Sequence, residues 1–137
     1  MKDSHRPAVH IVASFDRKEN ATMNNNIASA EDYYNGFNDK DVARISGHLH
    51  PEVQFVAPMG ELKGREAVVE AAKRLLGIMK GIKIRSKFGL DDQVMLVYDI
   101  RYGEPIGICR TAVLMNFKDG LIARIELFYD ARPFGNL

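Results

Sequence analysis

The chain has 137 residues, of which 46% are hydrophobic and 27% charged, and this suits a single globular domain with a core of its own. Its 19 Lys and Arg residues nearly balance 18 Asp and Glu residues, and no basic run stands out, so a surface for nucleic acid or an anionic membrane is not indicated. No apolar run approaches the roughly 20 residues that cross a bilayer, and the first residues lack the apolar core of a signal peptide. Because the single cysteine, Cys109, has no internal partner for a disulfide, we expect a protein of the reducing cytoplasm.

The first 26 residues differ from the rest of the chain. They begin polar, contain one short apolar run at 8–15, and end in the asparagine run 24–26. The run 8–15 is typical of an added strand, at a sheet edge or in a partner chain, and equally of a loosely held chain end. We therefore expect an N-terminal extension over 1–26 and a single domain over 27–137.

Helical spacing dominates the first half of that domain. Ser29 is a suitable N-cap, and an aromatic stripe follows it at Tyr33, Tyr34 and Phe37. Further along, the pattern predicts a short helix over 42–49, a strand over 53–57, a loop over 59–64 and a long amphipathic helix over 65–79.

Strand patterns dominate the second half. Apolar strands are predicted over 82–88, 94–102, 106–117 and 121–129, with turn signals between them. Helices followed by a meander of hairpins favour an α+β fold, in which a curved antiparallel sheet wraps around the helices.

The last predicted strand has two unlike faces. Side chains alternate along a strand, so its three charged residues, Arg124, Glu126 and Asp130, point the same way as Ile122 and Phe128. The opposite row is apolar apart from one tyrosine hydroxyl: Leu121, Ala123, Ile125, Leu127 and Tyr129. The charged row either faces water or lines a pocket with its polar groups.

Three stretches carry a family likeness: YYNGFNDKD, HPEVQFVAPMGELKGREAV and FKDGLIARIELFYD. In their order of elements they resemble the NTF2-like superfamily, and within it the SnoaL-like, ketosteroid-isomerase-like group. The likeness extends over about 27–134. It implies an NTF2-like cone with one deep pocket and a homodimer that packs sheet against sheet, while its diffuse motifs specify fold better than chemistry.

The resemblance to ketosteroid isomerases can be followed position by position. Those enzymes use a tyrosine and a protonated aspartic acid as an oxyanion hole and an aspartate as base. Tyr33 falls on the tyrosine position. The base position is Ala57 and the second acid falls on Ala112 or Val113, and because none of these side chains can carry a proton, this mechanism is not expected.

The C-terminal stretch is also similar to limonene epoxide hydrolases. Asp130, followed by Ala131 and Arg132, matches their active-site aspartate. The companion arginine and aspartate would fall on Val94 and Leu96, which are apolar, so epoxide hydrolysis by that route is not expected either.

These considerations lead to one hypothesis for the site. Asp130 is the candidate acid/base, assisted by Tyr33 as a hydrogen-bond donor and by Glu126 as a second acid. The alternatives are that Asp130 caps a turn or pairs with Arg132, and that Glu126 is an exposed partner of a neighbouring arginine. The predicted ligand-binding residues are Phe37, Phe55, Ala57, Met59, Leu96, Tyr98, Val113, Met115 and Phe128.

The predicted function is binding of a small hydrophobic or aromatic molecule in a conical pocket, with cofactor-free isomerase or cyclase chemistry at Asp130. The alternative is a non-catalytic NTF2-like module for ligand binding or dimerisation. No cofactor and no metal site are expected, because no glycine-rich phosphate loop or metal-spaced His/Cys cluster is present in the sequence. The expected partners are the small molecule and a second copy of the chain, with neither nucleic acid nor membrane.

Overall fold

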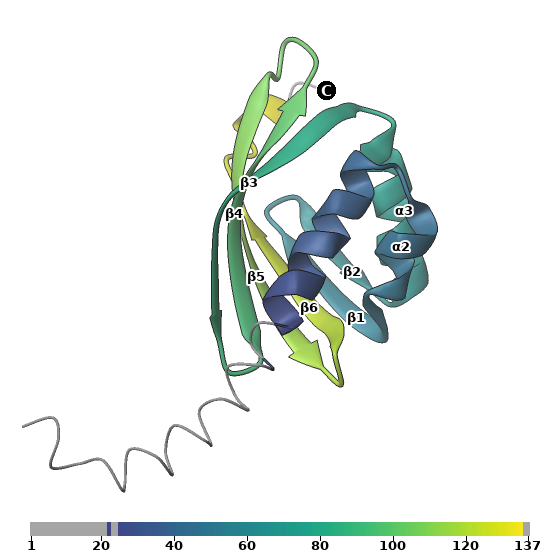
Figure 1. Cartoon of the computed structure of the whole chain (residues 1–137). Helices are drawn as coiled ribbons and strands as arrows, with labels where there is room; N and C mark the ends of the chain where they lie inside the picture. The colour runs from purple at the N-terminus through teal and green to yellow at the C-terminus, as the bar shows by residue number, and fades with distance from the viewer. Residues whose placement is uncertain (1–21, 23–24, 136–137) are drawn as a thin grey trace, which may run out of the picture.

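A computed structural model of the chain describes residue 22 and residues 25–135, so the predicted strand at 8–15 lies outside the described residues. A helix over 25–38 comes first, followed by α2 (Val42–Gly47) and α3 (Arg65–Leu76). The strands are β1 (Leu49–Ala57), β2 (Gly60–Lys63), β3 (Met79–Leu90), β4 (Gln93–Tyr102), β5 (Ile108–Lys118) and β6 (Leu121–Phe128), and a short 3-10 helix, η2 (Arg132–Phe134), follows them. The α+β architecture predicted from the sequence is confirmed (Figure 1).

The six strands form one curved sheet in the order β2-β1-β6-β5-β4-β3. Neighbouring strands run antiparallel except β1 and β6, which are parallel. The prediction of a purely antiparallel sheet is therefore wrong at this one junction. The hairpin signals in the sequence fix only the pairing of consecutive strands, whereas β1 and β6 are joined by α3 and four intervening strands, a long connection of the kind that parallel pairing requires.

Two predicted boundaries differ from the structure for local reasons. The second helix ends at Gly47, because Leu49 enters β1, where it is fully buried and pairs with Ile122. Pro51 lies inside β1 rather than before it, in the irregular stretch of the β1–β6 register where no ladder hydrogen bond is needed from its nitrogen. The predicted loop at 59–64 contains β2, which pairs with β1 as a hairpin.

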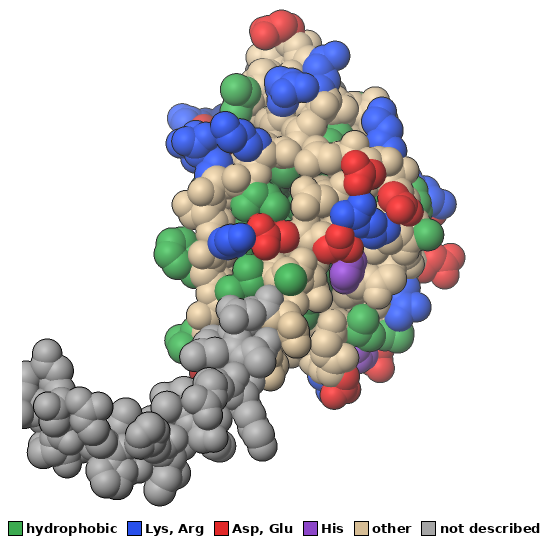
Figure 2. Space-filling model, viewed as in Figure 1, with side chains coloured by type: hydrophobic (Ala, Val, Ile, Leu, Met, Phe, Trp, Pro, Cys, Tyr) green, Lys and Arg blue, Asp and Glu red, His purple; other side chains and the backbone are tan. Residues whose placement is uncertain are grey.

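The core lies between the helices and the concave face of the sheet (Figure 1). The helix over 25–38 contributes Tyr33, Tyr34 and Phe37, as its aromatic stripe predicted, and α3 contributes Val68 and Ala72. The part of the chain that the structure describes has no helix long and apolar enough to cross a membrane. Figure 2 shows acidic and basic side chains interspersed over the side that carries the helices.

A bulge in β6 changes which of its side chains face the core. Asn116 of β5 pairs with Arg124 and the next residue, Phe117, pairs with Ile122, so Ala123 is an extra residue in the ladder. Ile122 and Ile125 are both buried as a result. The predicted alternation is wrong before Ala123, because Ile122 faces the core, and holds from Arg124 onward, where Ile125 and Leu127 face inward.

Candidate ligand-binding cavity

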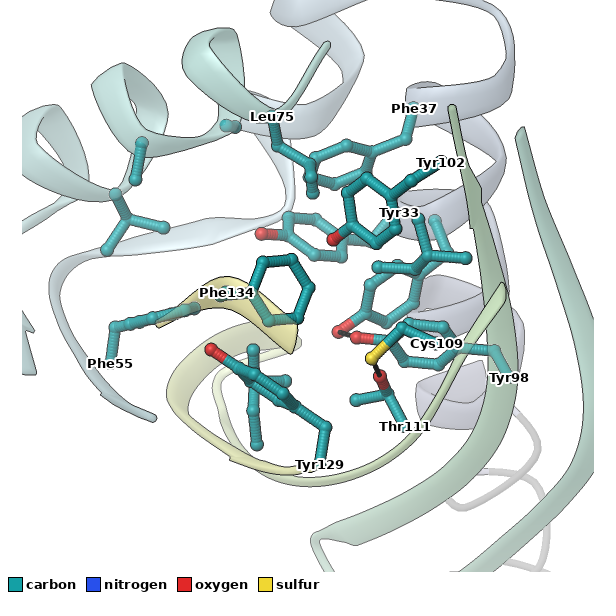
Figure 3. Close-up of a pocket in the computed structure, with 16 residues that line it drawn as sticks. Tyr33, Phe37, Phe55, Leu75, Tyr98, Tyr102, Cys109, Thr111, Tyr129 and Phe134 are labelled. Carbon is teal, nitrogen blue, oxygen red and sulfur yellow. Dashed lines mark hydrogen bonds between the residues drawn. The ribbon is translucent and has the colours of Figure 1, made fainter. Parts of the chain in front are cut away.

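A cavity of about 190 Å³ lies where the concave face of the sheet meets the helices (Figure 3). Its walls come from the helix over 25–38, α3, strands β1, β4, β5 and β6, and the segment that follows β6. The lining residues are Tyr33, Tyr34, Phe37, Phe55, Val68, Ala71, Ala72, Leu75, Tyr98, Ile100, Tyr102, Cys109, Thr111, Leu127, Tyr129 and Phe134.

All five tyrosines of the chain line this cavity. Tyr33 and Tyr34 come from the aromatic stripe of the first helix and contact each other edge to face, with ring centroids 5.0 Å apart. The hydroxyl of Tyr98, from β4, donates a hydrogen bond of 3.3 Å to the hydroxyl of Tyr34, drawn as a dashed line in Figure 3. This bond uses the proton of Tyr98 and a lone pair of Tyr34, and the Tyr34 proton stays available to a further acceptor.

The other three phenols have no such partner. Among the described residues, none forms a hydrogen bond with the hydroxyl of Tyr33, Tyr102 or Tyr129. The missing partner is most unusual for Tyr33, because only 3% of this residue is exposed to solvent and a buried phenol ordinarily has a hydrogen-bond partner. Its oxygen is not sealed in by protein atoms, so the hydroxyl borders the empty space of the cavity.

The lining offers neutral hydrogen-bond donors and no charge. Burial raises the pKa of the Tyr33, Tyr98, Tyr102 and Tyr129 hydroxyls, which all remain protonated at neutral pH. Among the described residues that line the cavity there is no carboxylate, lysine, arginine or histidine. The cavity can therefore polarise an acceptor oxygen, but its described lining holds no group that takes a proton at neutral pH.

Cys109 and Thr111 form the floor of the cavity on β5. The thiol and the hydroxyl lie 3.8 Å apart, a weak contact. Burial is the main cause that raises the pKa of the Cys109 thiol, so the sulfur is protonated at neutral pH and is a poor nucleophile. In the part of the chain that the structure describes, no cluster of His, Cys, Asp or Glu is suited to holding a metal ion.

The structure brings four of the predicted site residues together at the cavity. They are Tyr33 and Phe37 from the first helix, Phe55 from β1 and Tyr98 from β4. The aromatic stripe of the first helix was the signal for Tyr33 and Phe37.

Three predicted ligand-binding residues belong to the closed core instead. Leu96, Val113 and Met115 are completely buried, and none of them lines the cavity. Leu96 pairs with Val113 across β4 and β5, one inward-facing row deeper than Tyr98 and Thr111. The three predicted residues do lie on the inner face, but the sequence does not show how far along the strands the helices cover that face.

The remaining predicted wall residues lie elsewhere. Met59, at the turn between β1 and β2, is 60% exposed, and Phe128, on the outer row of β6, is 47% exposed. Ala57 lies half-buried at the end of β1 and does not line the cavity.

The two predicted acids lie away from Tyr33, outside the cavity lining. Asp130 is exposed and pairs with Arg132, which holds the pKa of this carboxyl well below its usual range, at about 2. The carboxylate of Glu126 lies on the outer sheet face, 3.4 Å from the guanidinium of Arg124. In both cases the side chain takes the alternative position named from the sequence, a local ion pair on the surface.

Several lining residues were not among the predicted site residues. Cys109 and Thr111 share the inward parity of Val113, and Tyr129 belongs to the apolar row of the last strand, so their alternation could have identified them. Tyr102, at the end of β4, has the same parity as Tyr98 and could have been identified by the same alternation. Phe134 lies beyond the last strand in η2, and no periodic signal in the sequence points to it.

With the geometry established, comparison with known proteins identifies the family. The family model of the SnoaL-like domain matches residues 30–125. The chain belongs to the SnoaL-like domain family. No curated protein matches it.

Solved structures place this SnoaL-like domain among proteins of NTF2-like fold. An NTF2-like protein of unknown function from Cytophaga hutchinsonii is 20% identical, with a TM-score of 0.71, over 78% of this chain and 91% of that one. A candidate ketosteroid isomerase from Kribbella flavida is 14% identical, with a TM-score of 0.70, over 79% of each chain. TerC, co-crystallised with polyporic acid, is 22% identical, with a TM-score of 0.70, over 82% of this chain and 97% of TerC. The resemblance stated from the sequence is confirmed at the level of fold and family.

Proposed function

We propose that this SnoaL-like domain binds an uncharged, ring-containing small molecule that carries at least one hydrogen-bond acceptor oxygen. The observation that supports the proposal is a set of three phenol hydroxyls, on Tyr33, Tyr102 and Tyr129, that have no hydrogen-bond partner among the described residues and that lie in a cavity with no charged side chain in its described lining. A carbonyl oxygen of the ligand would accept the hydrogen bonds that the protein leaves unmade.

The absence of charge in the described lining favours an uncharged ligand. Moving an ionised carboxylate into an apolar site without a paired cation costs far more than moving a neutral carbonyl. The neutral phenols are donors of the right kind for a ketone, an ester or a quinone. Each such bond contributes about 0.5–1.5 kcal/mol net, which corresponds to an affinity ratio of about 2 to 13.

The size of the cavity favours a ligand of one or two rings. An engineered apolar cavity of about 150 Å³ in another protein accommodates benzene. The volume here is about 190 Å³, and one side is formed by the segment after β6. The structure of TerC with polyporic acid supports the general idea that a protein of this fold holds an organic ligand.

Binding, rather than proton transfer, is the function we propose first. An isomerase or cyclase needs a group that accepts a proton, and the described lining has none at neutral pH. The proposal therefore assigns no proton transfer to Asp130 or Glu126, and it agrees with the non-catalytic alternative considered from the sequence. The cytoplasmic location stays a prediction, to be tested by cell fractionation.

Isothermal titration calorimetry with three matched probes tests the proposal. 1-Tetralone carries the ketone, tetralin is its hydrocarbon counterpart, and 1-naphthoate is a two-ring probe with a carboxylate. We expect the ketone to bind about 2 to 13 times more tightly than the hydrocarbon, from the net worth of one hydrogen bond. We expect the carboxylate to bind weakest. In Tyr33→Phe the advantage of the ketone should shrink, and Glu126→Gln, on the outer sheet face, serves as the control that should leave it unchanged.

Two results would contradict the proposal. If none of the three probes binds, the cavity is not a site for molecules of this class. If 1-naphthoate binds best, the ligand is an anion and a cation outside the described lining must contribute.

We also propose that two copies of the chain associate through the outer face of the sheet. Two outward-facing rows of this face are each apolar over three strands: Phe88, Met95 and Leu114 on β3, β4 and β5, and Val97, Ala112 and Phe128 on β4, β5 and β6. Phe88 is 63% exposed and Phe128 is 47% exposed, and large exposed apolar side chains that cluster mark interaction sites. Size-exclusion chromatography with light scattering should give the mass of a dimer, and Phe128→Asp should shift it to a monomer. A wild-type monomer at micromolar concentration would remove this proposal.

A further inference from the structure

The chain continues past β6 as a short segment, 129–135, that forms one side of the cavity. Tyr129 and Phe134 of this segment are both lining residues. The segment folds back as η2, in which the backbone N–H of Phe134 donates to the carbonyl of Ala131 at 3.0 Å and the N–H of Gly135 donates to that of Arg132 at 3.1 Å. A side chain from the last turn of the described chain thus reaches the cavity.

The ring of Phe134 lies between two tyrosines from different strands. It contacts Tyr102, at the end of β4, edge to face with centroids 5.4 Å apart, and Tyr129, just after β6, with centroids 5.7 Å apart. Strand β5 separates β4 from β6 in the sheet, so Phe134 connects the two sides of the cavity. Figure 3 shows its ring in the space between the two tyrosine rings.

Asp130 and Arg132 hold the turn that carries Phe134, and we refer to this pair as the clasp. The carboxylate of Asp130 accepts a hydrogen bond from the backbone N–H of Arg132 at 3.0 Å. It also accepts from the guanidinium, with Nε 2.9 Å from Oδ1 and Nη2 2.6 Å from Oδ2, the two-pronged geometry that fixes both position and angle. The clasp constrains residues 130–132, which Pro133 joins to Phe134.

The clasp is exposed, and this matters for ligand entry. The side chain of Arg132 is 90% exposed and that of Asp130 51% exposed. Ion pairs in such positions contribute little to stability, so the turn can open at small cost. The clasp therefore orients Phe134 without locking it.

We propose that Phe134 sets the upper size limit of the ligand, and that Asp130 is a positioning residue that holds Phe134 across the cavity. This rests on the proposed binding function. A ligand of two rings fits beneath Phe134, whereas a larger ligand must displace its ring from Tyr102 and Tyr129. The carboxylate that the sequence suggested as an acid/base acts here through the geometry of the turn.

A size series of ketones tests the proposal by calorimetry: acetophenone with one ring, 1-tetralone with two and 9-fluorenone with three. In the wild type we expect the affinity to be highest for 1-tetralone. In Phe134→Ala the preference should move to 9-fluorenone by about tenfold or more, the scale on which apolar pockets discriminate by size. Asp130→Ala, which loses both the ion pair and the bond to the backbone N–H, should move the preference in the same direction. Asp130→Asn, which keeps an acceptor for that N–H, should lie between Asp130→Ala and the wild type.

A second measurement does not depend on any ligand. Nuclear Overhauser contacts between the ring protons of Phe134 and Tyr102 should be present in the wild type, weakened in Asp130→Ala and unchanged in Glu126→Gln, whose ion pair lies outside the clasp. An unchanged size preference in Phe134→Ala would overturn the size limit. Unchanged ring contacts in Asp130→Ala would overturn the positioning role. If no ketone binds the wild type, the proposed binding function and the size limit both fail, while the ring contacts still decide the role of Asp130.

Discussion

Replacing Tyr33 with phenylalanine removes one oxygen atom from the cavity and leaves the ring in place. The same substitution at Tyr98 removes an oxygen that donates a hydrogen bond of 3.3 Å to Tyr34. Both side chains are almost completely buried, with 3% and 1% exposed, so the two variants differ mainly in whether the lost hydroxyl had a partner. We expect them to change the free energy of unfolding in opposite directions.

The magnitudes follow from the partners. A buried polar group without a partner costs about 1–3 kcal/mol, and because the Tyr33 hydroxyl borders a cavity that can admit water, the lower end applies. Tyr33→Phe should therefore raise the free energy of unfolding by about 1 kcal/mol in the absence of ligand. Tyr98→Phe gives up a formed hydrogen bond and should lower it by about 0.5–1.5 kcal/mol. For a domain of this size each kcal/mol corresponds to about 3 °C in Tm.

Urea unfolding followed by far-ultraviolet circular dichroism measures both values, with the slope m unchanged if the folded states are equally compact. A saturating ketone should reduce or reverse the advantage of Tyr33→Phe, because the wild type gains a bond that the variant cannot make. If Tyr33→Phe is destabilised as much as Tyr98→Phe without ligand, the Tyr33 hydroxyl has a partner in the free protein and the argument for the site fails. A gain in stability on removing the Tyr33 hydroxyl would agree with a hydroxyl that serves ligand binding rather than folding.

Three further predictions concern residues outside the cavity lining. Gly89→Ala would place its Cβ 2.8 Å from Cδ1 of Ile27, so we expect it to lower the free energy of unfolding by about 1 kcal/mol. Valine lacks that Cδ1 atom, so adding Ile27→Val should largely restore the stability, as measured by urea unfolding. Leu96→Ala should lower the free energy of unfolding by about 2–5 kcal/mol, because Leu96 is fully buried. Met59→Ala, at a side chain that is 60% exposed, should change it by no more than about 0.5 kcal/mol. Equal losses in the two variants would contradict the assignment of Leu96 to the core and Met59 to the surface. Hydrogen bonds, first from the Arg44 guanidinium and then from His48, lower the pKa of Asp32 to about 2, below its value in the unfolded chain. The contribution of Asp32 to the free energy of unfolding is therefore fully present above about pH 4 and is lost as the pH falls toward 2. Asp32→Asn should therefore lower the urea midpoint at pH 7 and flatten its decline between pH 4 and 2, and an unchanged decline would show that other groups set the acid limit.

Much of the fold follows from local patterns. The aromatic stripe placed Tyr33 and Phe37 on the buried side of the first helix, and the strands predicted over 94–102 and 106–117 correspond to β4 and β5. These predictions succeed because helix and strand periodicities depend only on backbone geometry. The family resemblance extended them to an NTF2-like cone.

What the sequence leaves open depends on contacts between distant residues. Nothing near Ala123 signals a bulge, which arises from pairing with β5, and nothing near Leu49 signals the parallel partner Ile122. The depth of the cavity along β4 depends on where the helices stop covering the sheet, so Leu96 and Tyr98 share a face but not a role. For Asp130 the sequence offered two positions, a pocket acid/base or a partner of Arg132, and the choice depends on which residues the fold brings to the cavity, where Asp130 is not a lining residue.

The concentration of tyrosine has a spectroscopic consequence. The chain contains five tyrosines and no tryptophan, and all five line one cavity. The tyrosine absorption band and the intrinsic tyrosine fluorescence of the folded protein therefore come from residues that line the cavity, and a molecule that enters it is expected to change them. A compound library could therefore be screened for binding by the tyrosine fluorescence of the unlabelled protein.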